Sequence, residues 1–179
     1  MSERKKLLKL ILSALFLALC YTLPFLTGQL QQLGNMLTPM HFPVLLCGFI
    51  CGWSWGLAVG LVAPLLRALT IGMPILFPHA VAMAFELGTY GAIAGLTYAV
   101  LPRKKLLLYP ALLAAMLAGR LVYGGAMLLI LGLGEGGYTW GAFLSAAVLR
   151  ALPGILLQLL LIPPLVLLLE RIKPKALRC

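Results

Sequence analysis

The sequence contains few charged residues, and acidic residues are the scarcest of them. Charged residues make up 10% of the 179 positions, with 14 lysines and arginines against 4 acidic residues, while hydrophobic residues make up 63%. A soluble domain needs about a quarter of its residues charged. The composition therefore predicts an integral membrane protein that contacts the lipid bilayer. The net charge of +10 indicates basic cytoplasmic loops, and we expect no nucleic-acid partner.

Motifs for nucleotide, metal and catalytic chemistry are also missing. The sequence has no G-x-x-x-x-G-K-[ST] motif, no H-E-x-x-H motif and no Ser/His/Asp set, so we expect no enzyme activity, no metal and no cofactor. The cysteines form no C-x-x-C pair, and Cys47 and Cys51 are expected to be small packing residues on one helix face. A metal site formed by His41, His79 and Glu86 is an alternative, although their spacing matches no ligand motif.

Long apolar runs predict the membrane helices, and charge decides how many there are. The region 40–72 is long enough for one span with an appendix or for two short spans. With six spans in all, eleven basic residues lie on the side of the N-terminus and none in the opposite loops; with five spans, seven of the eleven would lie opposite. Because cytoplasmic segments collect lysine and arginine, we predict one all-α domain, a compact bundle of six transmembrane helices with both termini in the cytoplasm. The expected helices are about 7–26, 40–52, 55–71, 80–101, 106–131 and 143–169 within a single domain of residues 1–179, with a tight turn at 53–54.

Glycines recur every four residues in the 40–72 region, at Gly48, Gly52, Gly56 and Gly60. Small residues at this spacing let helix backbones approach closely in lipid. The pattern predicts tight packing inside the bundle, and a groove for a partner is the alternative.

Four charged residues fall within the predicted spans: Arg67, Glu86, Arg120 and Arg150. A charge at the bilayer centre costs about 2.5–3.5 kcal/mol, so each one needs a reason. The predicted topology puts all four in the outer half of the membrane, which indicates a polar pocket open to the outside and not a channel. Three arginines against one glutamate suit a ligand with an anionic or acceptor-rich group. The alternative is that the arginines reach the membrane surface and that Glu86 forms a purely structural ion pair.

Several neutral side chains are placed to join this pocket. Tyr90 shares a helix face with Glu86, and Tyr123 shares one with Arg120. The outer loop 27–40 is rich in amides, and the loop 71–78 is a candidate gate over the ligand. The expected substrate-binding residues are Asn35, Arg67, His79, Glu86, Tyr90, Arg120, Tyr123 and Arg150.

The first predicted helix contains SALFLA at 13–18, in which Ala14 and Ala18 have A-x-x-x-A spacing. Two alanines four residues apart form a flat strip against which another helix can lie. The segment 39–74, PMHFPVLLCGFICGWSWGLAVGLVAPLLRALTIGMP, combines a proline-rich helix with a glycine-rich hairpin. In these features, and in length and topology, the chain resembles the substrate-binding (S) components of energy-coupling factor (ECF) vitamin transporters.

This resemblance implies a prokaryotic cell-membrane protein that captures a vitamin or vitamin precursor from outside. It implies a transmembrane coupling subunit, which would dock on Ala14 and Ala18, and two cytoplasmic ATPase subunits. The ligand would be held by the last three helices and by the loops 27–40 and 71–79. The segment 39–91 is similar to members linked to cobalamin precursors such as the lower-ligand nucleoside, whereas the arginine surplus fits pantothenate or another carboxylate. A self-sufficient secondary transporter or channel, and a membrane-embedded enzyme or scaffold, are the alternatives; a secondary transporter usually has more helices and internal repeats.

Overall fold

The computed structural model describes residues 3–26, 39–100, 107–132 and 152–172. Within these residues the chain forms six α-helices and one short π-helical turn, and no strand. The prediction of an all-α bundle of six helices is confirmed, while residues 143–151 of the last expected helix lie outside the described part. The elements are α1 (Glu3–Leu26), α3 (His41–Cys51), α4 (Trp53–Ile71), η1 (Leu76–Ala80), α5 (Val81–Val100), α6 (Leu108–Leu131) and α8 (Leu152–Ile172).

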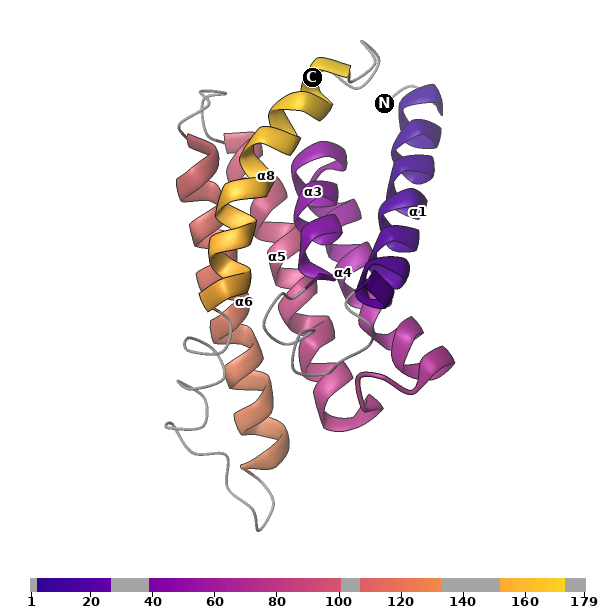
Figure 1. The fold of residues 1–179 in the computed structure, drawn as a ribbon, viewed down its shortest axis with the longest axis vertical. Coiled ribbons are helices and arrows are strands. Elements are labelled where there is room, and N and C mark those ends of the chain that lie inside the picture. The colour runs from indigo at the N-terminus through magenta and orange to yellow at the C-terminus, as the bar shows by residue number, and fades with distance from the viewer. Residues whose placement is uncertain (1–2, 27–38, 101–106, 133–151, 173–179) are drawn as a thin grey trace.

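The helices are long and apolar enough for a membrane protein. Among the described residues, four stretches could cross a membrane by length and composition, and two further apolar helices are shorter. Helix α1 begins and α8 ends at the same end of the bundle (Figure 1). The assignment of that end to the cytoplasm stays a prediction. The four long stretches are Glu3–Phe25, Trp53–Ile71, Leu76–Val100 and Leu108–Leu131, and the shorter helices are His41–Cys51 and Pro153–Leu169.

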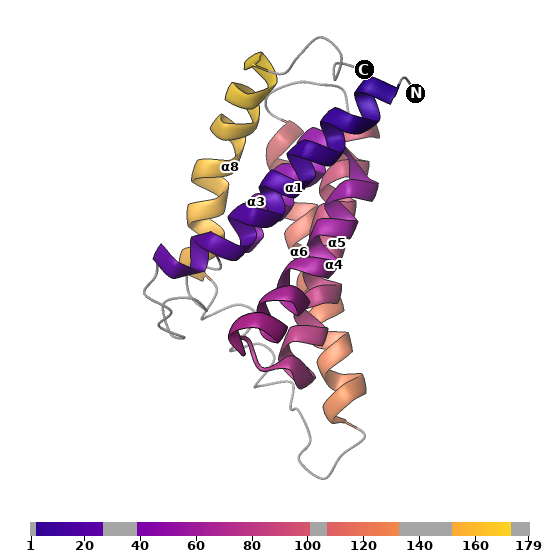
Figure 2. The same cartoon turned by 90° about the vertical axis from the view of Figure 1, so that its right-hand side faces the viewer.

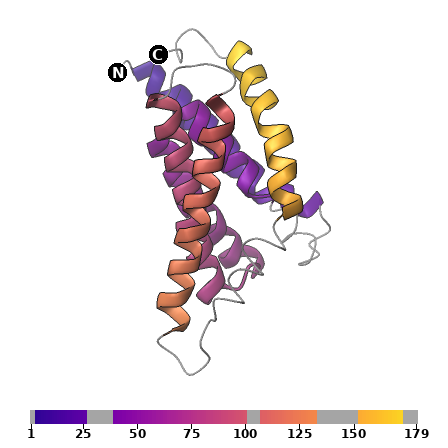
Figure 3. The same ribbon diagram turned by 90° about the vertical axis from the view of Figure 1, so that its left-hand side faces the viewer.

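Helix α5 is the centre of the bundle, because it packs against α3, α4 and α6. Helix α1 packs against α3 and α4, and Figure 2 shows it crossing them obliquely. Helix α8 contacts α3 and α6, and Figure 3 shows it on the side of the bundle away from α4. Side chains that point from α5 toward α3 and α6 are therefore enclosed by protein.

The glycine series explains how α3 and α4 approach α5 so closely. Cβ atoms added at Gly48 or Gly56 would overlap the carbonyl group of Gly91, and one at Gly60 would overlap the backbone of Leu87. The predicted close packing is thus confirmed at these glycines.

Gly52 has a different role from the other glycines of the series. It separates α3 from α4 and has a φ of 102°, a left-handed conformation that other residues rarely adopt. The break between the two short helices is therefore at Gly52, and the expectation of a turn at 53–54 was wrong by about one residue. The positive φ, which only glycine tolerates without strain, fixes the position of the break.

The contact between α4 and α5 is tested by the substitution Gly91→Ala. The added methyl group would overlap the backbone of Gly56, so the two helices must separate. We expect a loss of about 1–3 kcal/mol of stability, typical of overpacking, measured by unfolding of the purified protein in detergent micelles. Gly125→Ala is the matched control, because a Cβ there meets nothing within 4 Å. Equal stability of the two variants would contradict this account of the helix contact.

Candidate functional site

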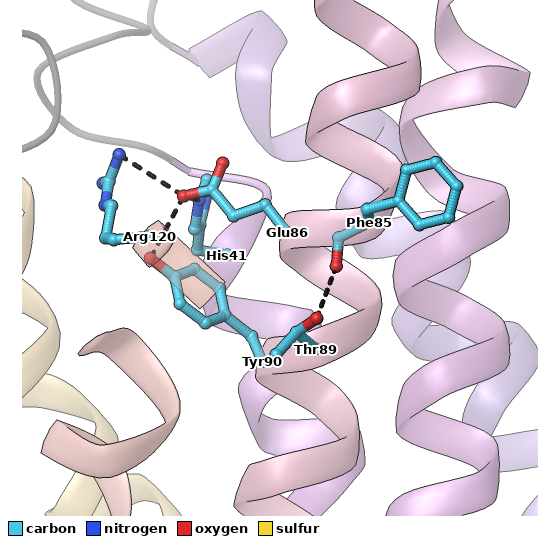
Figure 4. Close-up of polar contacts among 6 residues, drawn as sticks. All are labelled: His41, Phe85, Glu86, Thr89, Tyr90 and Arg120. Carbon is cyan, nitrogen blue, oxygen red and sulfur yellow. Dashed lines mark hydrogen bonds and ion pairs between the residues drawn. The ribbon is translucent and has the colours of Figure 1, made fainter. Parts of the chain in front are cut away.

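A buried carboxylate on α5 is the centre of the candidate site. The side chain of Glu86 is 3% exposed, and its Oε1 atom receives all of its described polar contacts. The Nη1 atom of Arg120 lies 3.3 Å from this oxygen, and the Tyr90 hydroxyl donates a hydrogen bond to it at 3.2 Å. The Nε2 atom of His41 lies 3.6 Å away. Figure 4 shows the second carboxylate oxygen directed away from Arg120 and Tyr90.

Three different helices supply these groups. Tyr90 follows Glu86 by one helical turn on α5, so the two share a face as the spacing predicts. Arg120 comes from the middle of α6, and His41 is the first residue of α3. The ring of Tyr90 lies between α5 and α6 because α6 has Gly119 at the contact, where a Cβ would overlap that ring. A small residue on α6 thus makes room for the aromatic side chain that bonds to Glu86.

The groups around Glu86 supply an opposite charge and a hydrogen bond. A charged carboxylate is costly in an apolar interior unless it is paired and hydrogen-bonded. Here the guanidinium of Arg120 supplies the opposite charge and Tyr90 supplies a hydrogen bond. Glu86 also lies beside the first residue of α3, and the N-terminal end of a helix has a partial positive charge. Removing one partner of such a buried pair typically costs about 3–5 kcal/mol.

Some polar atoms of the cluster have no hydrogen-bond partner within 3.5 Å among the described residues, although the Nε2 atom of His41 lies 3.6 Å from Glu86. They are both ring nitrogens of His41, which is 1% exposed, and the Nε atom of Arg120. Buried polar atoms in proteins are usually hydrogen-bonded, so three such atoms at one place call for an explanation. The predicted set of substrate-binding residues did not include His41. The sequence indicated only that His41 lies beside prolines at the same end of the bundle as Glu86. The packing of α3 on α5 is what brings the side chains of His41 and Glu86 together.

The described contacts of Arg67 are with α1 and not with the cluster around Glu86. The Arg67 side chain is buried, its Nη1 atom donates a hydrogen bond of 2.9 Å to the carbonyl oxygen of Tyr21, and its guanidinium lies 5.1 Å from the centroid of the Phe25 ring. Pro24 lies in the same turn of α1; a proline removes the helical donor of the carbonyl four residues earlier, here that of Cys20, and can kink the helix beside Tyr21. The described contacts of Arg67 thus join α4 to α1 and not to Glu86, and its part in ligand binding stays a prediction.

Of the other predicted residues, two contact each other and two lie outside the described part. The Nδ1 atom of His79 lies 3.4 Å from the Tyr123 hydroxyl, a contact that connects η1 to α6. Asn35 and Arg150 lie outside the described residues. Within the described ranges, no three His, Cys, Asp or Glu side chains are grouped so that they could hold a metal ion.

Comparison with protein families identifies the chain. A family model described as "ECF transporter, substrate-specific component" matches residues 8–166. The chain belongs to this family. The S component is accordingly a multi-pass membrane protein and a transporter subunit rather than an enzyme. It takes a small-molecule substrate and works with ECF partner subunits, as the resemblance implies. Comparison with curated proteins and with solved structures found no match.

The link between Arg67 and α1 is tested by Arg67→Met in the S component. The substitution keeps the length of the aliphatic chain but leaves the Tyr21 carbonyl without its donor. Hydrogen bonds from charged donors contribute about 1.5–3 kcal/mol, so we expect a loss of stability of that order in detergent. Arg4→Met is the matched control, because Arg4 is exposed on α1. If Arg67→Met unfolds at the same temperature as Arg4→Met, the link does not stabilise the bundle.

Proposed function

We propose that this S component captures a vitamin or vitamin precursor with high affinity from outside the cell, and that the cluster around Glu86 binds it. A transmembrane coupling subunit and two cytoplasmic ATPase subunits then energise uptake. The observation that carries the proposal is the cluster itself: a carboxylate, a guanidinium, an imidazole and a phenol from three helices meet in an otherwise apolar bundle.

The unpartnered atoms favour ligand binding over a purely structural ion pair. A structural pair is stable when every hydrogen-bonding group of both partners is satisfied. Here the ring nitrogens of His41 and the Nε atom of Arg120 have no described hydrogen-bond partner. The Arg120 side chain is also 16% exposed while Glu86 is 3% exposed. A bound molecule that reaches the cluster past Arg120 would complete its hydrogen bonds.

The position of the cluster along the bundle supports capture from outside. Glu86 lies near the start of α5, and α5 starts at the end of the bundle opposite to the start of α1 (Figure 1). Basic residues concentrate at the start of α1, and such residues collect on the cytoplasmic side. With both termini in the cytoplasm, as predicted, the cluster lies in the outer half of the membrane.

The outward face of α1 supports the proposed contact with the coupling subunit. Ala14 and Ala18 are exposed on α1, whereas Ser13, Phe16 and Cys20 are buried. The two alanines therefore lie on the face that does not pack within the bundle. A strip of small residues lets a second helix approach closely in lipid. We also propose that ligand binding involves further residues in addition to the cluster of Glu86, Tyr90, Arg120 and His41. They are Asn35, Arg67, His79, Tyr123 and Arg150.

The ligand site is tested by Glu86→Gln and Arg120→Gln. Each removes one charge, and a lost hydrogen bond to a charged group is worth about 1.5–3 kcal/mol, or about a tenfold to hundredfold loss of affinity. The measurement is the amount of small molecule that co-purifies with the full-length protein. Thr89→Val is the control, because the Thr89 hydroxyl donates its hydrogen bond to the Phe85 carbonyl and not to the cluster (Figure 4).

The proposed site would be wrong if both charge variants, purified as folded monodisperse protein, retained as much small molecule as Thr89→Val. Because each single variant leaves one buried charge unpaired, the double variant Glu86→Gln/Arg120→Gln provides a second measurement. It removes both charges and keeps side chains of similar size, so it separates loss of ligand from loss of fold.

The coupling face is tested by Ala14→Trp and Ala18→Trp. An indole on the exposed face of α1 holds an approaching helix away, while the inward face of α1 is unchanged. We expect ATP-dependent uptake by the reconstituted transporter to be abolished and ligand retention by the isolated S component to be unaltered. Leu19→Trp is the control, because Leu19 is exposed on α1 but lies on a different face from Ala14 and Ala18. Normal uptake by both alanine variants would exclude this face as the docking surface.

A further inference from the structure

We propose that the Glu86 cluster binds a ligand that has no net charge and presents hydrogen-bond donors and acceptors side by side. This inference rests on the function proposed above and names the class of molecule that the same site takes. The ligand class follows from two properties of the described atoms: which charges are already balanced, and which hydrogen-bonding groups have no described hydrogen-bond partner.

The guanidinium of Arg120 and the carboxylate of Glu86 balance each other's charge. Arg120 is the cation that an anionic ligand would need, but its Nη1 atom lies 3.3 Å from the carboxylate of Glu86. A ligand carboxylate close enough to bond to that nitrogen would therefore stand next to a second carboxylate. Two like charges at such a distance repel strongly in an apolar interior. The ligand would have to displace Glu86 from Arg120 and leave it buried without its counter-ion, which is unfavourable.

The second arginine of the helical core does not change this balance. The guanidinium of Arg67 donates to the Tyr21 carbonyl and lies over the Phe25 ring. It is thus used between α4 and α1. The arginine surplus that favours a carboxylate ligand in the sequence is therefore not present among the described groups that surround Glu86.

The open hydrogen-bonding groups require both donors and acceptors from the ligand. The Nε–H of Arg120 needs an acceptor, and so does the N–H of the His41 ring, whose other nitrogen accepts a hydrogen bond whenever the ring is neutral. The second oxygen of Glu86 points away from Arg120 and Tyr90 (Figure 4), and a carboxylate oxygen can accept a hydrogen bond from a ligand donor. Amides, hydroxyl-bearing rings and nitrogen heterocycles carry this mixture in adjacent positions. A zwitterion satisfies it as well, with its cation toward Glu86 and its anion toward Arg120.

The test identifies the small molecules that co-purify with the full-length protein by mass spectrometry. Wild type, Thr89→Val and the double variant Glu86→Gln/Arg120→Gln are compared. We expect a compound that is at least about tenfold depleted in the double variant, as loss of charged hydrogen bonds predicts, and that has no net charge at neutral pH. Tyr90→Phe, which removes a neutral hydrogen-bond donor to Glu86 and no charge, should retain more of the same compound than the double variant does.

The outcomes separate this inference from the proposed function. If the depleted compound is an anion, the site is correct and the ligand class is wrong. If no compound is depleted by the double variant, the site itself is wrong, and the ligand class fails with it. Pantothenate serves as a named anionic probe, and we expect it to leave the thermal stability of the purified protein unchanged. A rise in the unfolding temperature with pantothenate that the double variant lacks would overturn the inference.

Discussion

The pairing of a buried carboxylate with a guanidinium from the next helix is the interaction on which the polar centre of this protein depends. Glu86 is on α5, which packs against α3, α4 and α6. The Nη1 atom of Arg120 on α6 lies 3.3 Å from the Oε1 atom of Glu86. One side of α5 is made of small residues that let α3 and α4 approach its backbone. The face of α5 with Glu86 and Tyr90 is thereby enclosed by neighbouring helices. Because the carboxylate is buried, its hydrogen bonds and ion pairs come from the groups that surround it and not from water. Tight apolar packing and the polar site are therefore parts of one arrangement.

The two described arginines within the helical core have different roles. Arg120 neutralises Glu86 and keeps part of its surface exposed, so it is accessible to a ligand. Arg67 on α4 donates a hydrogen bond to a carbonyl of α1 near a proline. It therefore connects α4 to the helix that carries the two proposed docking alanines. The contact between His79 and Tyr123 connects η1 to α6. Residues 67–79 thus contact both α1, the proposed coupling helix, and α6, the helix that carries Arg120.

The sequence was sufficient for the features that depend on composition and helical spacing. The scarcity of charge predicted a membrane protein, the basic residues predicted six helices rather than five, and the spacing of four placed Tyr90 beside Glu86. The partners of Arg67 and the burial of His41 could not be predicted in this way, because both depend on which helices pack together. An arginine in an apolar helix has the same sequence signature whether it faces a carboxylate or a carbonyl. Gly52 likewise resembles its three neighbours in the glycine series and differs only in its φ of 102°.

The proposed function requires that the transported molecule completes the hydrogen bonds of the open groups around Glu86. The most direct measurement is an experimental structure of the full-length protein purified with its co-purifying small molecule. The account predicts that the molecule lies within hydrogen-bond distance of Glu86, His41 or Arg120, with the contact between Glu86 and Arg120 still in place. A ligand bound at another part of the bundle, with the ring nitrogens of His41 bonded only to protein groups, would contradict it.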